Sequence, residues 1–203
     1  MTYLRGHAAL VAQLAGEHVI LVLVALAIAL AIALPLGVLA ARRPRVGALI
    51  VAIAGVLYTI PSLALLALLV VALGIGPLSA IVALVLYAQL ALVRGVVAGL
   101  RGVDPALLDA ARGLGLSPRQ MLLRVEFPVA LPVVLGGVRL ATITLVALAT
   151  VAGWIEAGGL GTLIFDGLAE HHTQPVVVGA LASMVLAIAA DAALRGVGRQ
   201  VQR

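Results

Sequence analysis

Residues 18–41 read HVILVLVALAIALAIALPLGVLAA and carry no formally charged side chain. A helix needs roughly 20 predominantly apolar residues to cross the hydrocarbon core of a bilayer, which is about 30 Å thick. Glu17 precedes this run and Arg42 follows it. The stretch therefore predicts a transmembrane helix that is bounded by charge at both ends.

Further apolar stretches follow along the chain. Residues 46–93 carry no charge but are too long for one helix, and Gly74-Ile75-Gly76-Pro77 divides them because paired glycines and a proline favour a turn. We expect an all-α membrane protein of about five transmembrane helices in one domain, residues 1–203. The predicted spans are about residues 18–41, 47–73, 78–100, 129–152 and 176–190, with a charged loop at 101–128.

The composition excludes a soluble protein. Hydrophobic residues make up 64% of the 203 and charged residues 10%, whereas soluble domains are about half apolar and about a quarter charged. Cysteine is absent, so disulfides and thiolate metal sites are excluded. The net charge is +5, but aromatic residues are only 3% of the chain, so we expect no nucleic-acid partner. His171-His172 lacks an organised acidic partner, so we predict no metal site.

The arginines predict the orientation in the membrane. Five spans place the two termini on opposite sides, and cytoplasmic segments carry an excess of basic residues. The segments after spans one, three and five contain most of the arginines, so we expect the C-terminus in the cytoplasm and the N-terminus outside. These arginines are Arg42, Arg43, Arg45, Arg101, Arg112, Arg119, Arg124, Arg195, Arg199 and Arg203; the opposite face has Arg5 with Glu17, Glu156, Asp166 and Glu170.

The loop at 101–128 predicts two short helices. Asp104-Pro105 is typical of a helix start, because aspartate caps free amides and proline suits the first turn. The first helix carries an apolar stripe at helical spacing, and Asp109 lies beside Arg112, with which it could pair. The stripe comprises Leu107, Ala110, Ala111 and Leu114. Such a helix could lie on lipid headgroups or dock a partner protein, and the pattern alone favours neither.

The remainder of the loop indicates a hinge and a second helix start. Gly113 and Gly115 are expected to end the first helix. Ser117 and Gln120 have the spacing of a capping box at the start of the second helix. The two helices should therefore meet at a glycine hinge.

The same loop resembles the signature of permease subunits of binding-protein-dependent ABC importers. That signature is Glu-Ala-Ala, three residues, Gly, nine residues, then Ile, any residue and Leu-Pro. Here Asp109-Ala110-Ala111, Gly115, Val125 and Phe127-Pro128 match its spacing. Asp replaces Glu, Val replaces Ile and Phe replaces Leu, and each keeps the chemical type. The shorter reach of Asp109 leaves its ion-pair partner open.

The resemblance extends over nearly the whole chain. Residues 59–66 (TIPSLALL), 136–139 (GGVR) and 158–161 (GGLG) look like the osmoprotectant branch, which imports glycine betaine, choline, carnitine or proline. The resemblance implies a type I importer fold and a multi-pass subunit of the cell (inner) membrane. It also implies a second permease subunit, identical or different, two ATPase subunits in the cytoplasm and an extracytoplasmic substrate-binding protein. The chain is expected to bind no cofactor itself, since ATP is used by the partner ATPase.

In this family the loop helix sits in a cleft of the ATPase and passes its movement to the spans. By this resemblance, Leu107, Ala110, Ala111 and Leu114 would fill the cleft, Asp109 would form a salt bridge there, and Pro128 would end the coupling segment. Gly115 would let the two short helices meet at a sharp angle. We therefore expect a bulky residue at Gly115 to abolish transport while insertion into the membrane survives.

Five residues within the spans are candidates for a translocation path: Tyr58, Pro61, Ser62, Tyr87 and Arg139. Pro61 should kink span two beside Ser62, where a gate and a packing role are equal alternatives. A charge inside a bilayer is costly, which makes Arg139 a functional candidate. It lies about three turns from Pro128, however, so we favour the alternative that it extends to the cytoplasmic interface. Quaternary ammonium groups are usually held by aromatic cages, and no cage is evident among the scattered aromatic residues.

A secondary transporter or channel for a small solute is the main rival function. Its mark would be buried acids paired across spans, whereas the acids here cluster in loops, with Asp191 the exception. A membrane enzyme is the other rival, but neither a Gly-x-Ser-x-Gly nor a His-Glu-x-x-His motif occurs. Because a Walker A motif is also absent, we expect a transport subunit that does not hydrolyse ATP itself.

Overall fold

The computed structural model describes residues 6–201, and the regular structure within them is helical, with no strand. Arg5 and Arg203, which the charge argument used, lie outside the described residues. The all-α prediction is confirmed. The elements are α2 (Ala8–Arg42), α3 (Pro44–Thr59), α4 (Ser62–Leu73), α5 (Pro77–Arg101), α6 (Pro105–Gly113), α7 (Pro118–Met121), a π-helical turn η1 (Leu122–Glu126), α8 (Phe127–Val151), a 3₁₀ turn η2 (Ala152–Ile155), α9 (Leu160–Ala169) and α10 (Thr173–Val201).

Four of the described helical segments are long and apolar enough to cross a membrane, and a bent pair raises the number to as many as five. The four are 8–42, 77–101, 118–155 and 173–200, and the bent pair is α3 with α4. Two helices extend beyond the apolar runs from which they were predicted: α2 begins before Glu17, and α10 continues through Asp191. Charged groups near the ends of an apolar run do not stop a helix when they find partners, as both of these do.

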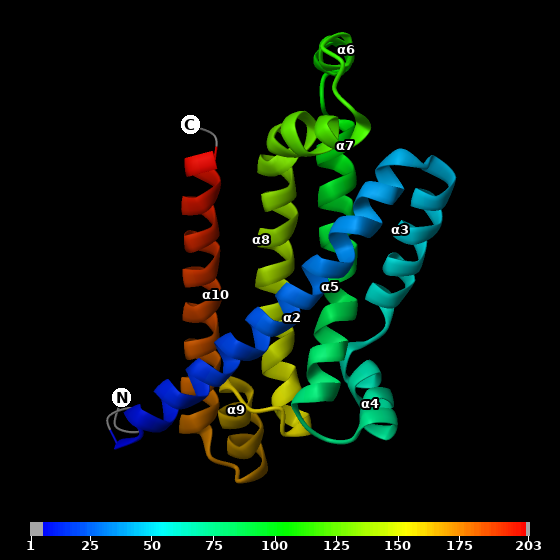
Figure 1. Ribbon diagram of the computed structural model, residues 1–203. Helices are drawn as coiled ribbons and strands as arrows, with labels where there is room; N and C mark the ends of the chain where they lie inside the picture. The colour runs from blue at the N-terminus through cyan, green and yellow to red at the C-terminus, as the bar shows by residue number, and fades with distance from the viewer. Residues whose placement is uncertain (1–5, 202–203) are drawn as a thin grey trace.

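The second predicted span is not one helix. The helices α3 and α4 meet at 95° across Ile60 and Pro61. Ile60 adopts an extended conformation with ψ 128°, which is the conformation that a following proline favours. The expected kink at Pro61 is therefore a break, and α4 lies at the end of the bundle that is remote from the loop helix α6 (Figure 1). Pro132, by contrast, lies inside the continuous helix α8.

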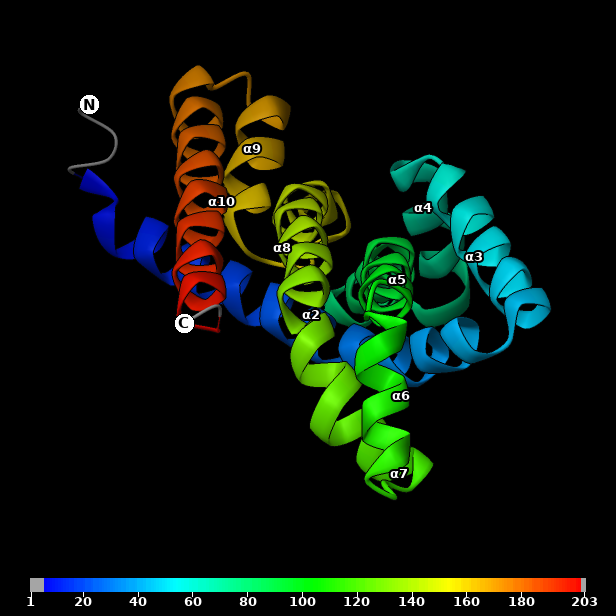
Figure 2. The same cartoon turned by 90° about the horizontal axis from the view of Figure 1, so that it is seen from above.

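The long helices form a bundle that α2 crosses obliquely. Figure 1 shows α5, α8 and α10 running roughly side by side, with α2 passing diagonally across them from the N-terminus. Seen from above, α2 lies along one side of α5 and α8, and α9 and α4 lie toward the other (Figure 2). The described parts nearest the two termini lie at opposite ends of the bundle. Which end faces the cytoplasm stays a prediction.

At the crossing of α5 and α8 two glycines meet. A Cβ atom added to Gly95 would lie 3.0 Å from the Cα of Gly137, and one added to Gly137 would lie 2.9 Å from the carbonyl oxygen of Ala91. Small residues allow such close backbone approach, which drives helix association where lipid removes the hydrophobic effect. The crossing fixes α5 and α8 relative to each other, and both line the site described below.

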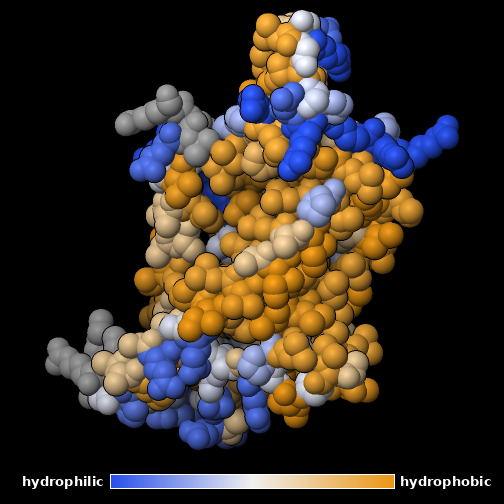
Figure 3. All heavy atoms as spheres, in the orientation of Figure 1, coloured by the Kyte–Doolittle hydropathy of each residue, from blue (hydrophilic) through white to orange (hydrophobic). Residues whose placement is uncertain are grey.

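The surface has the pattern of a membrane protein. Hydrophobic residues cover the middle of the molecule, and hydrophilic residues gather at its two ends (Figure 3). Exposed large side chains such as Ile20, Val56, Leu68, Leu140 and Val185 belong to this apolar band. Lipid tails would solvate such a band, whereas water would not.

Candidate functional site

The helix α6 stands clear of the bundle at one end of the molecule (Figure 1). It begins as the sequence predicted, because the side chain of Asp104 accepts a hydrogen bond from the backbone N–H of Ala106 at 2.8 Å and Pro105 occupies the first turn. Such a cap satisfies an amide that has no partner within the helix. A helix of nine residues needs these local contacts, since it packs little against the rest of the chain.

The end of α6 is a tight turn centred on Gly115. This glycine has φ +75°, whereas Gly113 remains within the helix. The backbone N–H of Leu116 donates to the carbonyl of Ala111 and that of Gly115 to the carbonyl of Arg112, which is the Schellman pattern of helix termination. The capping box that was predicted for Ser117 and Gln120 then starts α7. Of the two glycines, only Gly115 supplies the left-handed backbone conformation of the hinge.

The apolar stripe of the loop points partly outward. The side chains of Leu107 and Leu114 are exposed, and Leu114 reaches 80% exposure. Ala110 is exposed as well, but Ala111 is buried. Leu114 lies just after the last residue of α6, as its C-cap. The loop therefore presents two leucines and one alanine outward, while Ala111 packs toward its own chain.

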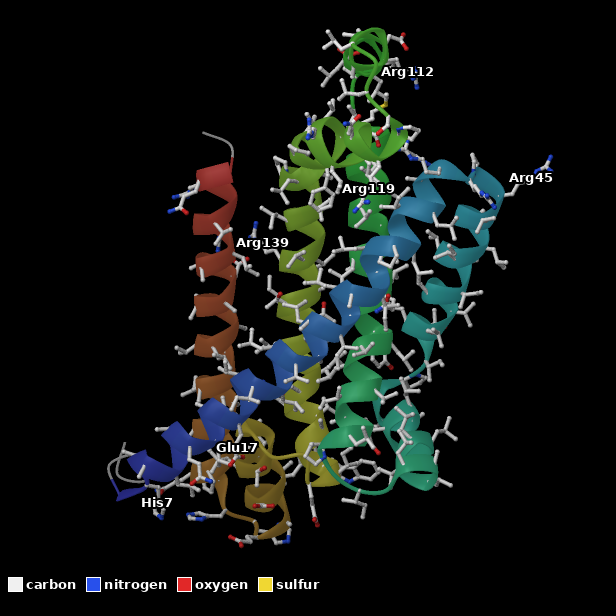
Figure 4. All side chains as sticks on the ribbon, in the orientation of Figure 1. His7, Glu17, Arg45, Arg112, Arg119 and Arg139 are labelled. Atoms are coloured by element: carbon white, nitrogen blue, oxygen red, sulfur yellow. The ribbon has the colours of Figure 1, made fainter. Side chains whose placement is uncertain are left out.

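Asp109 and Arg112 form the ion pair that the sequence suggested, at 2.6 Å. Both side chains are largely exposed, at 71% and 62%, and Arg112 points away from the bundle in Figure 4. An exposed pair of this kind contributes little to stability. Its carboxylate remains accessible to a partner.

The chain returns from the loop through the π-helical turn η1 and reaches Pro128 in the first turn of α8. Glu126, at the end of this turn, is almost fully buried and accepts a hydrogen bond from Arg42 at 2.6 Å. Its second oxygen, Oε1, is buried with no hydrogen-bond partner. The pair joins the last residue of α2 to the base of the loop. Sequence reasoning missed it, because Glu126 falls at an unrestricted position of the loop signature.

The structure brings together four of the five candidate path residues, namely Tyr58, Pro61, Ser62 and Tyr87. The rings of Tyr58 and Tyr87 are 5.9 Å apart and nearly perpendicular. The Tyr87 hydroxyl donates to the carbonyl of Ile60, next to Pro61 at the break between α3 and α4. Ser62 is the first residue of α4.

Arg139 does not join this group. Its Nε donates to Asp191 of α10, and the other oxygen of Asp191 accepts from Arg195. Figure 4 shows Arg139 on α8, between α8 and α10. An acidic partner on the neighbouring helix therefore holds Arg139, and its extension to the cytoplasmic interface stays a prediction.

Arg94 is a functional candidate that sequence reasoning overlooked. It lies on α5, exposed, and lines a cavity together with Tyr58 and Tyr87. The available signal was a single charge inside the predicted span 78–100, which marks a functional position by default.

A second polar centre ties α2 to α9 at the opposite end of the molecule. His18 is fully buried; its Nδ1 accepts from the backbone N–H of Leu160, and its Nε2 lies 3.1 Å from the carbonyl of Val146. The adjacent Glu17 accepts from the backbone N–H of Gly159. Figure 4 shows Glu17 near α9. The ring must be neutral with its proton on Nε2, because Nδ1 acts as an acceptor.

Replacing His18 by leucine should destabilise the fold through this contact. The N–H of Leu160 would lose its side-chain acceptor in a buried place, which costs about 1–3 kcal/mol. His18→Gln is the matched control, because its amide can both accept and donate. Thermal unfolding of the detergent-purified subunit measures the difference. Equal stability of the leucine variant and the wild type would contradict the assigned contact.

Substitution at Gly115 should impair the loop without impairing membrane insertion. In the described residues nothing lies within 4 Å of a Cβ atom built at Gly115, so the penalty comes from the backbone at φ +75°. A residue with a Cβ costs about 1–2 kcal/mol there, which lowers the population of the native hinge by roughly 5- to 30-fold. Gly115→Trp adds bulk beside the exposed leucines, whereas Gly115→Asn tolerates the left-handed conformation. We expect solute uptake to fall steeply for tryptophan and little for asparagine at equal membrane levels, and normal uptake by Gly115→Trp would refute the hinge.

Metal binding finds no support in the described part of the chain. Residues 6–201 contain no group of three or more His, Asp or Glu side chains that could hold a metal ion. Trp154 is half-exposed on η2 and does not join Tyr58 and Tyr87 around their cavity.

Comparison with known proteins finds a matching family over most of the chain. Residues 33–203 match the family described as binding-protein-dependent transport system inner membrane component. The chain is 39% identical to the carnitine transport permease protein OpuCB of Listeria monocytogenes, over 93% of this chain and 86% of that protein. It is 35% identical to the glycine betaine/carnitine/choline transport system permease protein OpuCB of Bacillus subtilis, over 99% of this chain and 93% of that protein.

A solved structure matches the fold over nearly its whole length. A chain of the MetNI methionine ABC transporter, in an inward-facing conformation, superposes with a TM-score of 0.87 at 25% identity. The match covers 98% of this chain and 99% of that one.

Proposed function

Because this chain belongs to the family of binding-protein-dependent transport system inner membrane components, it is a membrane-spanning subunit of an ATP-driven importer, and we propose that its cargo is a quaternary-ammonium osmoprotectant. Glycine betaine, carnitine and choline are the solutes in the names of its relatives. The paired rings of Tyr58 and Tyr87 support this cargo, since aromatic faces attract quaternary ammonium groups.

The observation that carries the coupling role is the protruding helix α6. Leu107 and Leu114 are exposed on it, at an end of the molecule rich in arginine. In a lone subunit these leucines face water, which favours a protein partner over solvent. The partner is an ABC ATPase, whose surface would cover Leu107, Ala110 and Leu114 and meet the Asp109 carboxylate.

The arginine-rich loop end also supports an orientation of the subunit in the membrane. The loop end faces the cytoplasm, where ATP is available, and the end formed by α4, α9 and the start of α2 faces outward. A substrate-binding protein delivers cargo to that outer end, and a second permease subunit completes the path in the cell membrane. The chain itself contributes no ATPase site and no cofactor.

Uptake in proteoliposomes tests this function. The subunit is reconstituted with its ATPase and binding protein, and uptake of labelled glycine betaine, carnitine and choline is measured with ATP or a non-hydrolysable analogue inside. ATP-dependent accumulation of at least one of these solutes is expected. Accumulation of none of them, by a complex that hydrolyses ATP in response to the binding protein, would overturn the cargo assignment.

The pair of Arg139 with Asp191 gives a reason to test secondary transport as well. It is an ion pair across two spans, which is the mark expected of a secondary transporter. Proteoliposomes that carry the subunit alone under a sodium or proton gradient provide the test. Solute accumulation driven by the gradient without ATPase would favour this second function.

A further inference from the structure

A cavity of about 460 Å³ opens on the face of α5 and α8 that α2 does not cover. Its lining comes from α3, α5 and α8, with none from α2. The close approach of Gly95 and Gly137 forms part of its wall, so side chains around the crossing leave room for a small molecule. Pockets that hold small ligands have volumes of about 300–1,000 Å³.

Arg94 supplies a positive charge to this cavity. Within residues 6–201 its guanidinium group makes no hydrogen bond and no salt bridge, unlike those of Arg42, Arg112, Arg139 and Arg195. It lies seven residues after Tyr87, so the two share one face of α5 and are about 10 Å apart along the axis. Side chains on a helix lean toward its N-terminus, which tilts Arg94 toward Tyr87. An uncompensated charge within a span needs water or an anion as its partner.

Two tyrosines, Tyr58 and Tyr87, line the same cavity. Tyr58 of α3 is half-exposed, whereas Tyr87 of α5 is buried and held by its hydrogen bond to Ile60. Their nearly perpendicular rings, 5.9 Å apart, present two aromatic surfaces to a guest, and such surfaces bind organic cations. The cavity thus offers aromatic rings on one side and a guanidinium group on the other.

We propose that this cavity is a membrane subsite for zwitterions that join a quaternary ammonium group to a carboxylate. The ammonium group would contact Tyr58 and Tyr87, and the carboxylate would accept hydrogen bonds from Arg94, whose planar donors suit it. Glycine betaine and carnitine have both groups, whereas choline has a hydroxyl in place of the carboxylate. Arg94 therefore favours carboxylate-bearing osmoprotectants over choline during passage. This inference rests on the proposed function and assigns its substrate preference to one residue.

The test is uptake by the complete transporter, with its ATPase and binding protein, in proteoliposomes. Glycine betaine and choline are compared for wild type, Arg94→Gln and Arg94→Lys, and each variant's uptake is divided by the wild-type uptake of the same solute. The binding protein's own preference cancels in this ratio. A charge-assisted hydrogen bond contributes about 1.5–3 kcal/mol, so Arg94→Gln should lower betaine uptake by roughly 10- to 100-fold at low solute concentration. Choline uptake should stay within about twofold, and Arg94→Lys should retain part of the betaine uptake.

Arg45→Gln serves as the matched control, because Arg45 is exposed at the start of α3 and does not line the cavity. Equal loss of betaine and choline uptake in Arg94→Gln would overturn the proposal, because it would show a structural role such as contact with the second subunit. Unchanged uptake of both solutes would overturn it as well, since Arg94 would then only extend to the interface. Failure of the wild-type complex to accumulate either solute with ATP would instead refute the proposed function, and with it the premise of the subsite.

Discussion

Replacing Asp109 by arginine is expected to abolish association of the subunit with its ATPase, and with it ATP-driven uptake. The substitution removes an exposed carboxylate and places a second cation beside Arg112, so the docking surface changes from a neutral pair to a doubly positive patch. Like charges brought together at an interface cost several kcal/mol, so affinity should fall by roughly a hundredfold or more. Co-purification of the two proteins in detergent measures the loss directly.

The intrahelical partner of Asp109 allows a sharper version of the experiment. Exchanging the two charges, with Asp109→Arg and Arg112→Asp together, restores an ion pair on α6 but leaves the acidic group one turn away. If a basic residue of the ATPase requires the carboxylate at position 109, the exchange will not restore association. Full recovery by the double variant would show that only the stability of α6 matters. Retention of the ATPase by Asp109→Arg alone would refute the docking contact altogether.

Leu114→Asp examines the apolar part of the same surface. Leu114 is 80% exposed in the lone subunit, so its replacement costs the subunit itself little stability. Lost ATPase association with unchanged thermal unfolding would therefore assign the leucine to the interface.

The loop was predictable because its structure is encoded by neighbours in the sequence. Asp104 caps an amide two residues away, Ser117 and Gln120 cap each other across three residues, and Gly115 ends α6 through bonds within one turn. Such contacts depend on residue type and spacing alone, so a pattern specifies them. The long apolar runs are equally local, which is why the helical class could be inferred as well.

The contacts that hold the bundle together were not predictable in this way. Glu126 meets Arg42 from 84 residues away, and His18 meets the carbonyl of Val146 from 128 residues away. No spacing rule joins such positions, because the packing of whole helices brings them together. The break at Pro61 has the same origin in part: a proline predicts a bend, but the 95° angle depends on where α4 finds its packing partners.

Arg94 could be recognised in the sequence, but its surroundings could not. Its charge stood out from an apolar span, yet only the structure shows that it shares a cavity with Tyr58 and Tyr87. Tyr58 and Tyr87 were both path candidates, but their contact was not predicted, since the two tyrosines are on different helices and 29 positions apart. A binding site assembled from single residues on several helices leaves no motif in any one of them.

Removing the negative charge of Asp191 is expected to release α10 from α8. Both carboxylate oxygens are occupied, Oδ1 by Arg139 of α8 and Oδ2 by Arg195 of α10. Asp191→Asn would leave two arginines facing each other beside the spans with no counter-charge, which is more costly than losing the pair as a whole. Helix α10 otherwise packs against α9 and α8, where Gly179 approaches the carbonyl oxygen of Leu160, but few of its residues are buried. The yield of monodisperse subunit after membrane extraction should fall, although the partial exposure of Arg139 and Arg195 limits the penalty.

Exchanging the two charges distinguishes a role of the ion pair from a role of the acidic group alone. The double variant Arg139→Asp with Asp191→Arg keeps the net charge and rebuilds a pair between α8 and α10, whereas each single change leaves like charges opposed. We expect the double variant to recover much of the yield that both single variants lose, which is a coupling between residues in direct contact. Arg199→Gln, at an exposed position in the last turns of α10, should leave the yield unchanged. Single variants that express and unfold like the wild type would show that α10 is held by apolar packing against α8 and α9, and that the ion pair serves another purpose.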